Sequence, residues 1–139
     1  MKVKKIMSSP VETVDSRSKI SEAAEKMKSF DVGVLPVMRE DEITGIITDR
    51  DIIVRILAEG MDPKKTSVSK AMTEEAASCS EDTDIEEAVR IMEEKKVHRL
   101  LVLDENDEVS GILSISDIAR KMKDEHLLHE LLERICQPV

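Results

Sequence analysis

Two short segments of the sequence each place a hydroxyl side chain three residues ahead of an aspartate. The segments contain Gly45, Thr48 and Asp51, and Gly111, Ser114 and Asp117. This spacing is common where an α-helix begins, because the two side chains bond backbone groups of its first turn. It also suits a nucleotide, because free N–H groups at a helix start attract phosphate and a carboxylate accepts hydrogen bonds from ribose hydroxyls. The residues alone leave both interpretations open.

Catalytic motifs are absent from the sequence. It has no nucleophile elbow, Walker loop, dinucleotide-binding glycine motif, HExxH pair or clustered carboxylate dyad. Only four glycines are present, which leaves little room for a phosphate-cradling loop. We therefore expect a protein that is not an enzyme and has no obligatory cofactor.

Metal and disulfide chemistry are not expected either. Cys79 and Cys136 lie far apart without metal-ligand spacing, so free thiols are the simplest expectation. His126 and His129 have a helical spacing that could ligate a metal, but no further ligands converge in the sequence. A solvated helix face is the simpler interpretation.

The charge of the chain limits its partners. A net charge of −9 disfavours nucleic acid and anionic membranes, which attract basic surfaces. Residues 1–65 carry 12 basic and 12 acidic side chains and residues 66–139 carry 9 and 18. An anionic ligand is therefore expected to meet less repulsion on the first half, provided that the fold does not bring the acidic groups round to it. No apolar run reaches the roughly 20 residues that span a bilayer. Since no signal peptide is recognisable either, a cytoplasmic location is expected.

The chain contains an internal repeat. A shift of 65 residues, which grows to 66 after one insertion, superposes most of residues 3–122 on themselves. The matched pairs include Val3 with Val68, Met7 with Met72, Ile20 with Ile85, Ala23 with Ala88, Met27 with Met92, and Gly45 with Gly111. The two segments with the hydroxyl and the aspartate therefore occupy equivalent positions in two copies of one unit.

Each copy has the pattern of strand, helix, strand, turn, strand and helix. The first copy predicts strands at 11–14, 34–38 and 43–47, a helix with the apolar stripe Ile20, Ala23, Ala24, Met27 and Phe30, and a second helix at 52–57. In the second copy the elements fall at 77–80, 84–95, 99–103, 109–113 and 115–123. Thr83 and Glu86 have capping-box spacing, which predicts where the helix at 84–95 starts.

These elements predict an α+β fold, in which two β-α-β-β-α repeats pack sheet to sheet with pseudo-two-fold symmetry. The expected domains are repeat 1 at 1–58, a linker at 59–66, repeat 2 at 67–123 and a helical tail at 124–139. The helix at 52–57 is apolar nearly all round, so its second face is either buried inside the monomer or forms a homodimer contact. The tail helix has the stripe Leu127, Leu128, Leu131, Leu132 and Ile135, and either caps the second repeat or joins that contact.

The doubled motifs resemble two tandem CBS domains, together called a Bateman module. The resemblance covers residues 1 to about 123 and rests on the starts at Met7 and Met72, the strands at 32–37 and 97–102, and the doubled Gly-x-x-Thr/Ser-x-x-Asp-Ile segment. It implies a stand-alone CBS protein, a regulatory module that binds AMP, ADP, ATP or S-adenosylmethionine in clefts between the repeats.

The resemblance also implies roles for individual residues. Asp51 and Asp117 match the ribose-binding aspartates, and Thr48, Arg50, Ser114 and Ser116 match positions that contact phosphate or ribose. The adenine slot is implied at Met7, Val11, Glu12, Val32 and Gly33 in one copy and at Met72, Ala77, Val97 and His98 in the other. The slot of one repeat is expected to pair with the aspartate of the other, which gives two pseudo-symmetric sites.

The two sites are not expected to be equal. His98 and Arg99 resemble a pair that adenylate-sensing members of the family direct at phosphates, whereas the first copy has Gly33 and Val34 there. Arg99 is alternatively a surface charge on an edge strand. Leu101 stands where the first copy has Pro36.

The leading hypothesis is a sensor of adenosine-containing ligands that forms a homodimer and signals through the dimer arrangement to a regulated protein. The alternative is an interaction or scaffold module with vestigial nucleotide clefts, in which Thr48 and Ser114 act only as helix caps. The acidic second half favours AMP, ADP or cationic S-adenosylmethionine over ATP.

Overall fold

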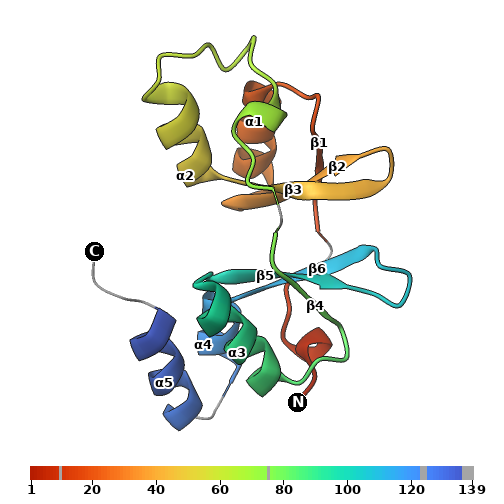
Figure 1. Cartoon of the computed structure of the whole chain (residues 1–139), viewed down its shortest axis with the longest axis vertical. Coiled ribbons are helices and arrows are strands. Elements are labelled where there is room, and N and C mark those ends of the chain that lie inside the picture. Colours follow the sequence, from red (N-terminus) through yellow and green to blue (C-terminus); the bar gives the residue numbers. More distant parts are fainter. Residues whose placement is uncertain (10, 75, 123–124, 136–139) are drawn as a thin grey trace. The chain divides into compact units, whose positions relative to one another are not determined.

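The computed structural model describes residues 1–9, 11–74, 76–122 and 125–135 (Figure 1). The chain divides into two compact units. We call Glu12–Ala76 the first-repeat unit, and Met1–Val11 with Ala77–Val139 the second-repeat unit. The segment that precedes each repeat in the sequence therefore packs with the other repeat.

The first-repeat unit has one sheet of three strands in the order β1-β2-β3. Its elements are β1 (Val14–Asp15), α1 (Ile20–Phe30), β2 (Val34–Arg39), β3 (Glu42–Thr48), α2 (Asp49–Ile52), the π-helical turn η2 (Ile53–Leu57) and the 3-10 turn η3 (Val68–Lys70). Strand β1 runs parallel to β2, and β3 is antiparallel to it. The β2–β3 turn places Glu40 and Asp41 at φ of 50° and 67°, which is typical of a type I′ hairpin.

The second-repeat unit has the same topology, with the order β4-β5-β6. Its elements are the 3-10 turn η1 (Val3–Lys5), β4 (Ser78–Ser80), α3 (Ile85–Lys95), β5 (Arg99–Leu103), β6 (Val109–Ser114), α4 (Ile115–Lys121) and α5 (Glu125–Ile135). The predicted α+β class, the two repeats and the C-terminal helix are confirmed. The last predicted helix of the second copy is shorter than the expected 115–123, because the residue after Lys121 is already extended.

The first strand of the chain is shorter than predicted, and proline explains the difference. The expected strand at 11–14 is observed as Val14–Asp15, paired with Val37 and Met38. The next residue of β2 toward the start of the ladder is Pro36, which has no N–H to donate. Its counterpart Leu101 donates its N–H to the carbonyl of Ala77 at 3.0 Å, so the second ladder extends further.

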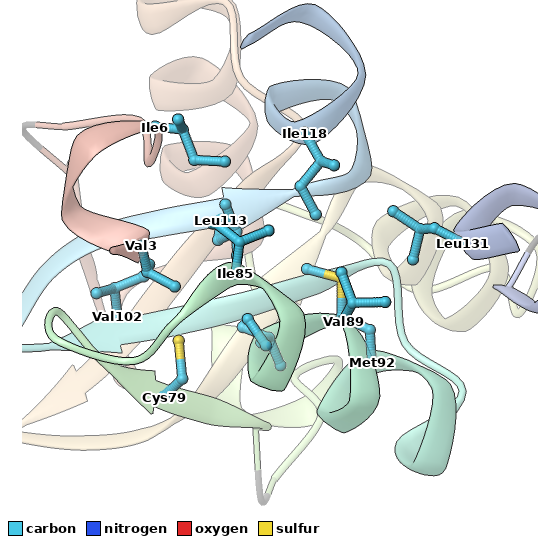
Figure 2. Packing of buried hydrophobic residues seen from close by; sticks show 12 residues of the cluster. Val3, Ile6, Cys79, Ile85, Val89, Met92, Val102, Leu113, Ile118 and Leu131 are labelled. Atoms are coloured by element: carbon cyan, nitrogen blue, oxygen red, sulfur yellow. The ribbon is translucent and has the colours of Figure 1, made fainter. Parts of the chain in front are cut away.

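Each unit has its own apolar core between its helices and its sheet. In the second-repeat unit the core joins η1, the sheet and three helices, as Figure 2 shows for Val3, Val102 and Leu113. Cys79 is a buried free thiol of this core, and burial raises its pKa to about 11. Cys136 lies outside the described residues.

The apolar stripe predicted for α1 is only partly buried. Ile20, Ala23 and Met27 belong to the core, whereas Ala24 and Phe30 are exposed. The prediction was wrong for these two because only one narrow face of the helix contacts the sheet.

The start of α3 differs from the predicted capping box. Its N-cap is Asp84, which makes no side-chain capping bond, and the Thr83 hydroxyl instead accepts a hydrogen bond from the Ser80 N–H at 3.1 Å. The N–H of Ile85 donates to the carbonyl of Met1 at 3.0 Å. The N-terminal segment, residues 1–9, thus replaces the side-chain cap that the local sequence predicted.

The helix predicted at 52–57 begins at Asp49, and its second face is not buried. Ile52 and Ile56 lie in the core, but Ile53, Val54 and Leu57 are 57%, 46% and 58% exposed. The expectation of burial inside the monomer was therefore wrong for this face.

The tail helix α5 caps the second-repeat unit. Leu131 is fully buried beside Val89 and Met92 of α3, as Figure 2 shows, and Leu127 and Leu128 pack against the same core. Arg134 of α5 donates to Glu93 of α3 at 3.1 Å. Leu132 remains exposed, so the stripe is buried on one side only.

Two glycines allow the preceding segments to cross the sheets. The backbone of Ser8 pairs with Ile112 of β6 in both directions, at 2.9 and 3.0 Å. In the first-repeat unit Thr73, which lies between η3 and β4 in the sequence, pairs with Ile46 of β3 at 2.8 and 3.0 Å. A Cβ on Gly45 would lie 2.3 Å from the Thr73 carbonyl oxygen, and one on Gly111 would lie 2.5 Å from Met7 Sδ.

The exchange of segments also removes the predicted charge asymmetry. The first-repeat unit contains 10 basic and 14 acidic residues, and the second-repeat unit contains 11 and 16. The units therefore carry net charges of −4 and −5. The condition for a less repulsive first half is therefore not met, because the basic residues at 2, 4 and 5 pack with the second repeat.

We predict that alanine at the crossing glycines destabilises the protein in a fixed order. Gly45→Ala should lower the free energy of unfolding by about 3 kcal/mol, because its Cβ meets a backbone oxygen. Gly111→Ala should cost about 1–2 kcal/mol, because its nearest neighbour is a flexible methionine end. Gly33→Ala is the matched control, since its close contacts are all with the movable carboxylate of Asp49. Urea unfolding measures the series, and an unchanged midpoint for Gly45→Ala would contradict the crossing geometry.

Candidate functional site

The two hydroxyl and aspartate segments form complete capping boxes at strand-to-helix junctions. The Asp51 N–H donates to Thr48 Oγ1 at 3.1 Å, and the Thr48 N–H donates to Asp51 Oδ2 at 2.9 Å. At the end of β6, the corresponding distances between Asp117 and Ser114 are 3.1 and 3.0 Å. The helix-cap interpretation of both segments is confirmed, and each carboxylate is held in a fixed orientation by its own helix start.

Free backbone donors, which a phosphate would need, are missing at the first junction. The N–H of Asp49 donates to the carbonyl of Gly33 at 3.0 Å, and that of Arg50 donates to Asp49 Oδ1 at 2.9 Å. With the Asp51 N–H bonded to Thr48, the first turn of α2 has no free N–H to offer. The N–H groups of this turn therefore already have partners within the chain, namely the Gly33 carbonyl and the side chains of Asp49 and Thr48.

The two carboxylates differ in what surrounds their second oxygen. Asp51 Oδ1 has the Arg55 Nε at 3.8 Å, beyond hydrogen-bond distance, and the side chain is 14% exposed. Asp117 Oδ1 accepts from Ser8 Oγ at 2.8 Å and from Arg120 Nη2 at 3.2 Å, and the side chain is 2% exposed. Protein donors therefore occupy Asp117 more completely than Asp51.

A basic residue one turn after each aspartate was not identified from the sequence. Arg55 Nη1 donates to the carbonyls of Ala71 and Met72 at 3.2 and 3.1 Å, and Lys121 Nζ donates to the carbonyl of Ile6 at 2.9 Å. Both cations lie 3.8 Å from their aspartate. The signal was available, because the 66-residue shift superposes Arg55 on Lys121 and each is four residues after an aspartate.

The predicted site residues are divided between the two units. The first-repeat unit contains Glu12, Val32, Gly33, Thr48, Arg50, Asp51 and Met72, and the second-repeat unit contains Met7, Val11, Ala77, Val97, His98, Arg99, Ser114, Ser116 and Asp117. Each methionine of the doubled start therefore lies in the same unit as the aspartate of the other repeat.

The surroundings of the predicted adenine slot vary along it. Met7, Ala77 and Val97 pack on the core of the second-repeat unit, and Met72 packs on that of the first. Val11 is partly buried, and Val32 is exposed. Glu12 pairs with Lys26 at 3.4 Å.

The polar candidates of the second repeat are accessible. His98 and Arg99 are exposed and make no side-chain hydrogen bond or ion pair within the described residues, and Arg50 and Ser116 are exposed as well. Arg99 is thus a surface charge, as the alternative expected, but β5, which it begins, is the central strand of its sheet and not an edge strand.

Neither a metal cluster nor a membrane-spanning helix is seen in the part of the chain that the structure describes. His129 pairs with Glu133 at 3.3 Å on an exposed face of α5, and His126 is exposed.

Two copies of one β-α-β-β-α unit, each with a capping-box aspartate after its last strand, define a CBS domain pair. The family model of the CBS domain matches residues 3–58 and 68–124. The chain belongs to the CBS domain family.

Relatives and solved structures agree with this assignment. Hypoxic response protein 1 of Mycobacterium tuberculosis is 33% identical over 135 residues, which cover 96% of this chain and 93% of the relative. The crystal structure of Hypoxic Response Protein I with two coordinated zinc ions has a TM-score of 0.76 and 31% identity, over 88% of this chain and 99% of that one.

Two further structures are similar to this chain. The CBS domain pair of protein MJ0100, in complex with 5-methylthioadenosine and S-adenosyl-L-methionine, has a TM-score of 0.76 and 30% identity, over 86% of this chain and 94% of that one. A hexameric CBS-CP12 protein from bloom-forming cyanobacteria has a TM-score of 0.79 and 26% identity, over 88% of this chain and 72% of that one.

The capping boxes predict unequal losses of stability. Ser114→Ala removes both an acceptor for the Asp117 N–H and a 3.0 Å donor to Asp117 Oδ2, so it should cost about 2 kcal/mol. Thr48→Ala removes only the acceptor for the Asp51 N–H and should cost about 1 kcal/mol. Urea unfolding of the two variants measures the difference, and Ser18→Ala, which lies outside both boxes, is a control for loss of a hydroxyl. A larger loss for Thr48→Ala would contradict the described bonding.

Proposed function

We propose that this protein is a regulatory module that binds adenosine-containing ligands and is not itself an enzyme. The observation that carries the proposal is the doubled capping box, which fixes the orientation of a carboxylate at the end of a strand in each repeat. An ionised carboxylate only accepts hydrogen bonds, and the two vicinal hydroxyls of a ribose supply donors at matching spacing. The similar pair from protein MJ0100 is in complex with two adenosyl compounds, which supports this ligand class.

The ligand favoured here carries little negative charge. Both units are acidic, with net charges of −4 and −5, and the first turn of α2 has no free backbone donor. These features favour AMP, ADP or cationic S-adenosylmethionine over ATP. Binding energy then comes mainly from the ribose and the base.

The proposed binding residues are those that the family resemblance implied. The residues next to the capping-box carboxylates in the sequence are Thr48, Arg50, Ser114 and Ser116. The exposed side chains that can donate hydrogen bonds to a phosphate are His98 and Arg99. The base is assigned to the partly apolar positions around Met7, Val97 and Ala77 and their counterparts in the other copy.

Signalling is proposed to occur through a homodimer. Ile53, Val54 and Leu57 form an exposed apolar face on the helix that Asp49 begins, and such a patch is typical of an interaction surface. Asp51 lies in α2, which continues directly into the turn η2 that carries this apolar face. A ligand that hydrogen-bonds to Asp51 can therefore change the position of the face. A ligand shifts the arrangement to the extent that it binds one arrangement more tightly. The proposed location is the cytoplasm, where the thiol of Cys79 would stay reduced.

The second candidate is a scaffold module without a ligand. The completed hydrogen bonds of the capping boxes favour it, because Thr48 and Ser114 need no ligand to account for their presence. The two candidates differ in whether any adenosyl compound stabilises the protein.

A thermal-shift and calorimetric screen tests the ligand directly. Purified protein, shown to be free of copurified nucleotide, is mixed with AMP, ADP, ATP, S-adenosylmethionine or inorganic phosphate at about 1 mM. A ligand at 100 times its dissociation constant should stabilise the fold by about 2.7 kcal/mol, an easily measured shift. We expect S-adenosylmethionine or AMP to exceed ATP, and phosphate alone to have no effect. No shift with any adenosyl compound would favour the scaffold.

The dimer is tested by charge placed on the exposed face. Leu57→Glu should convert a dimer into a monomer in sedimentation equilibrium, because a carboxylate cannot be buried there without a partner. Leu132→Glu is the matched control, since Leu132 is an exposed leucine of α5. A wild-type monomer, or a variant that still dimerises, would contradict the proposed interface.

A further inference from the structure

The two aspartates of the doubled motif differ in the donors that already hold them. Each uses Oδ2 to accept the N–H of its own Thr or Ser. Asp117 Oδ1 additionally accepts from Ser8 and Arg120, at 2.8 and 3.2 Å. The nearest cation to Asp51 Oδ1 is Arg55, and its 3.8 Å separation leaves that oxygen able to accept a new hydrogen bond.

The sequence explains why the two aspartates have different donors. The 66-residue shift places Arg120 on Val54, so the first copy has no cation where the second has one. Ser8 corresponds to Thr73, which pairs with β3 through its backbone and makes no side-chain bond to Asp51 within the described residues. The donors that occupy Asp117 are therefore specific to the second repeat.

The bond from Ser8 to Asp117 spans 109 residues of sequence and has a structural consequence. It attaches the N-terminal segment to the start of α4, beside the backbone pairing of Ser8 with Ile112. Lys121 adds a second attachment through the carbonyl of Ile6 at 2.9 Å. A ribose that bound Asp117 would have to displace Ser8 or Arg120 from a carboxylate that is 2% exposed. Ser8 and Arg120 are themselves exposed, so the buried group at stake is the Asp117 carboxylate.

We infer that the two matching aspartates have different tasks: Asp51 accepts the ribose hydroxyls of the ligand, and Asp117 anchors the N-terminal segment to the second repeat. This assignment rests on the proposed function for its first half and on the structure of one unit for its second half. It gives one adenosyl ligand per chain, although the motif occurs twice.

Calorimetric titration with S-adenosylmethionine and with AMP tests the first half. The wild type should bind one equivalent per chain, and Asp51→Asn should weaken binding by about tenfold or more, because a bond to a charged acceptor is lost. Asn preserves the cap of α2, so the midpoint of thermal unfolding should stay near that of the wild type. Ser8→Ala should bind with unchanged stoichiometry. Two equivalents per chain, or a greater loss of affinity in Asp117→Asn than in Asp51→Asn, would overturn the assignment.

Unfolding of Ser8→Ala, Asp117→Asn and the double variant tests the second half without any ligand. Each single change should lower the unfolding midpoint by roughly 3 °C or more, and the double variant should lose less than the two changes summed, because both remove one shared bond. Additive losses, or no loss, would overturn the anchor. If no adenosyl compound binds the wild type, the role of Asp51 falls together with the proposed function, and this cycle still decides the role of Asp117.

Discussion

The crossing of each preceding segment over a glycine is the constraint on which the rest of the structure depends. The carbonyl of Thr73 approaches Gly45 too closely for any side chain, and Met7 and Ser8 fill the same space beside Gly111. These contacts bring Met72 into the unit of Asp51 and Met7 into the unit of Asp117. Each carboxylate therefore lies in a unit where a segment from a distant part of the sequence crosses the sheet.

The same crossing explains why two copies of one motif have become unequal. A basic residue one turn after each aspartate bonds the carbonyls of the crossing segment in both units. Only the second copy adds Ser8 and Arg120 as donors to the carboxylate. In the first copy Val54 replaces the arginine, and that change both frees the carboxylate and makes the helix surface apolar. The single difference between Val54 and Arg120 thus affects both the proposed ligand site and the proposed dimer face.

Much of the fold could be predicted from the sequence, because the repeat and the hydrophobic periodicity are local signals. The strands, the helices and the cap at Ser114 followed from spacing alone. The exchange of segments could not be predicted, since it depends on contacts such as Met1 with Ile85 that no periodicity encodes. The occupied donors of α2 were missed for the same reason, because Gly33 reaches Asp49 only in three dimensions. The exposure of Phe30 shows that an apolar stripe predicts burial only where a surface is present to cover it.

Carboxyl carbon NMR of the intact protein tests the central claim most directly, since it observes both aspartates in one sample. Signals of Asp51 and Asp117 are assigned with the two Asn variants, and S-adenosylmethionine or AMP is then added to saturation. The account predicts that the Asp51 signal moves with the occupancy of the ligand, while the Asp117 signal keeps its position. Movement of the Asp117 signal with Asp51 unchanged, or equal movement of both, would contradict it.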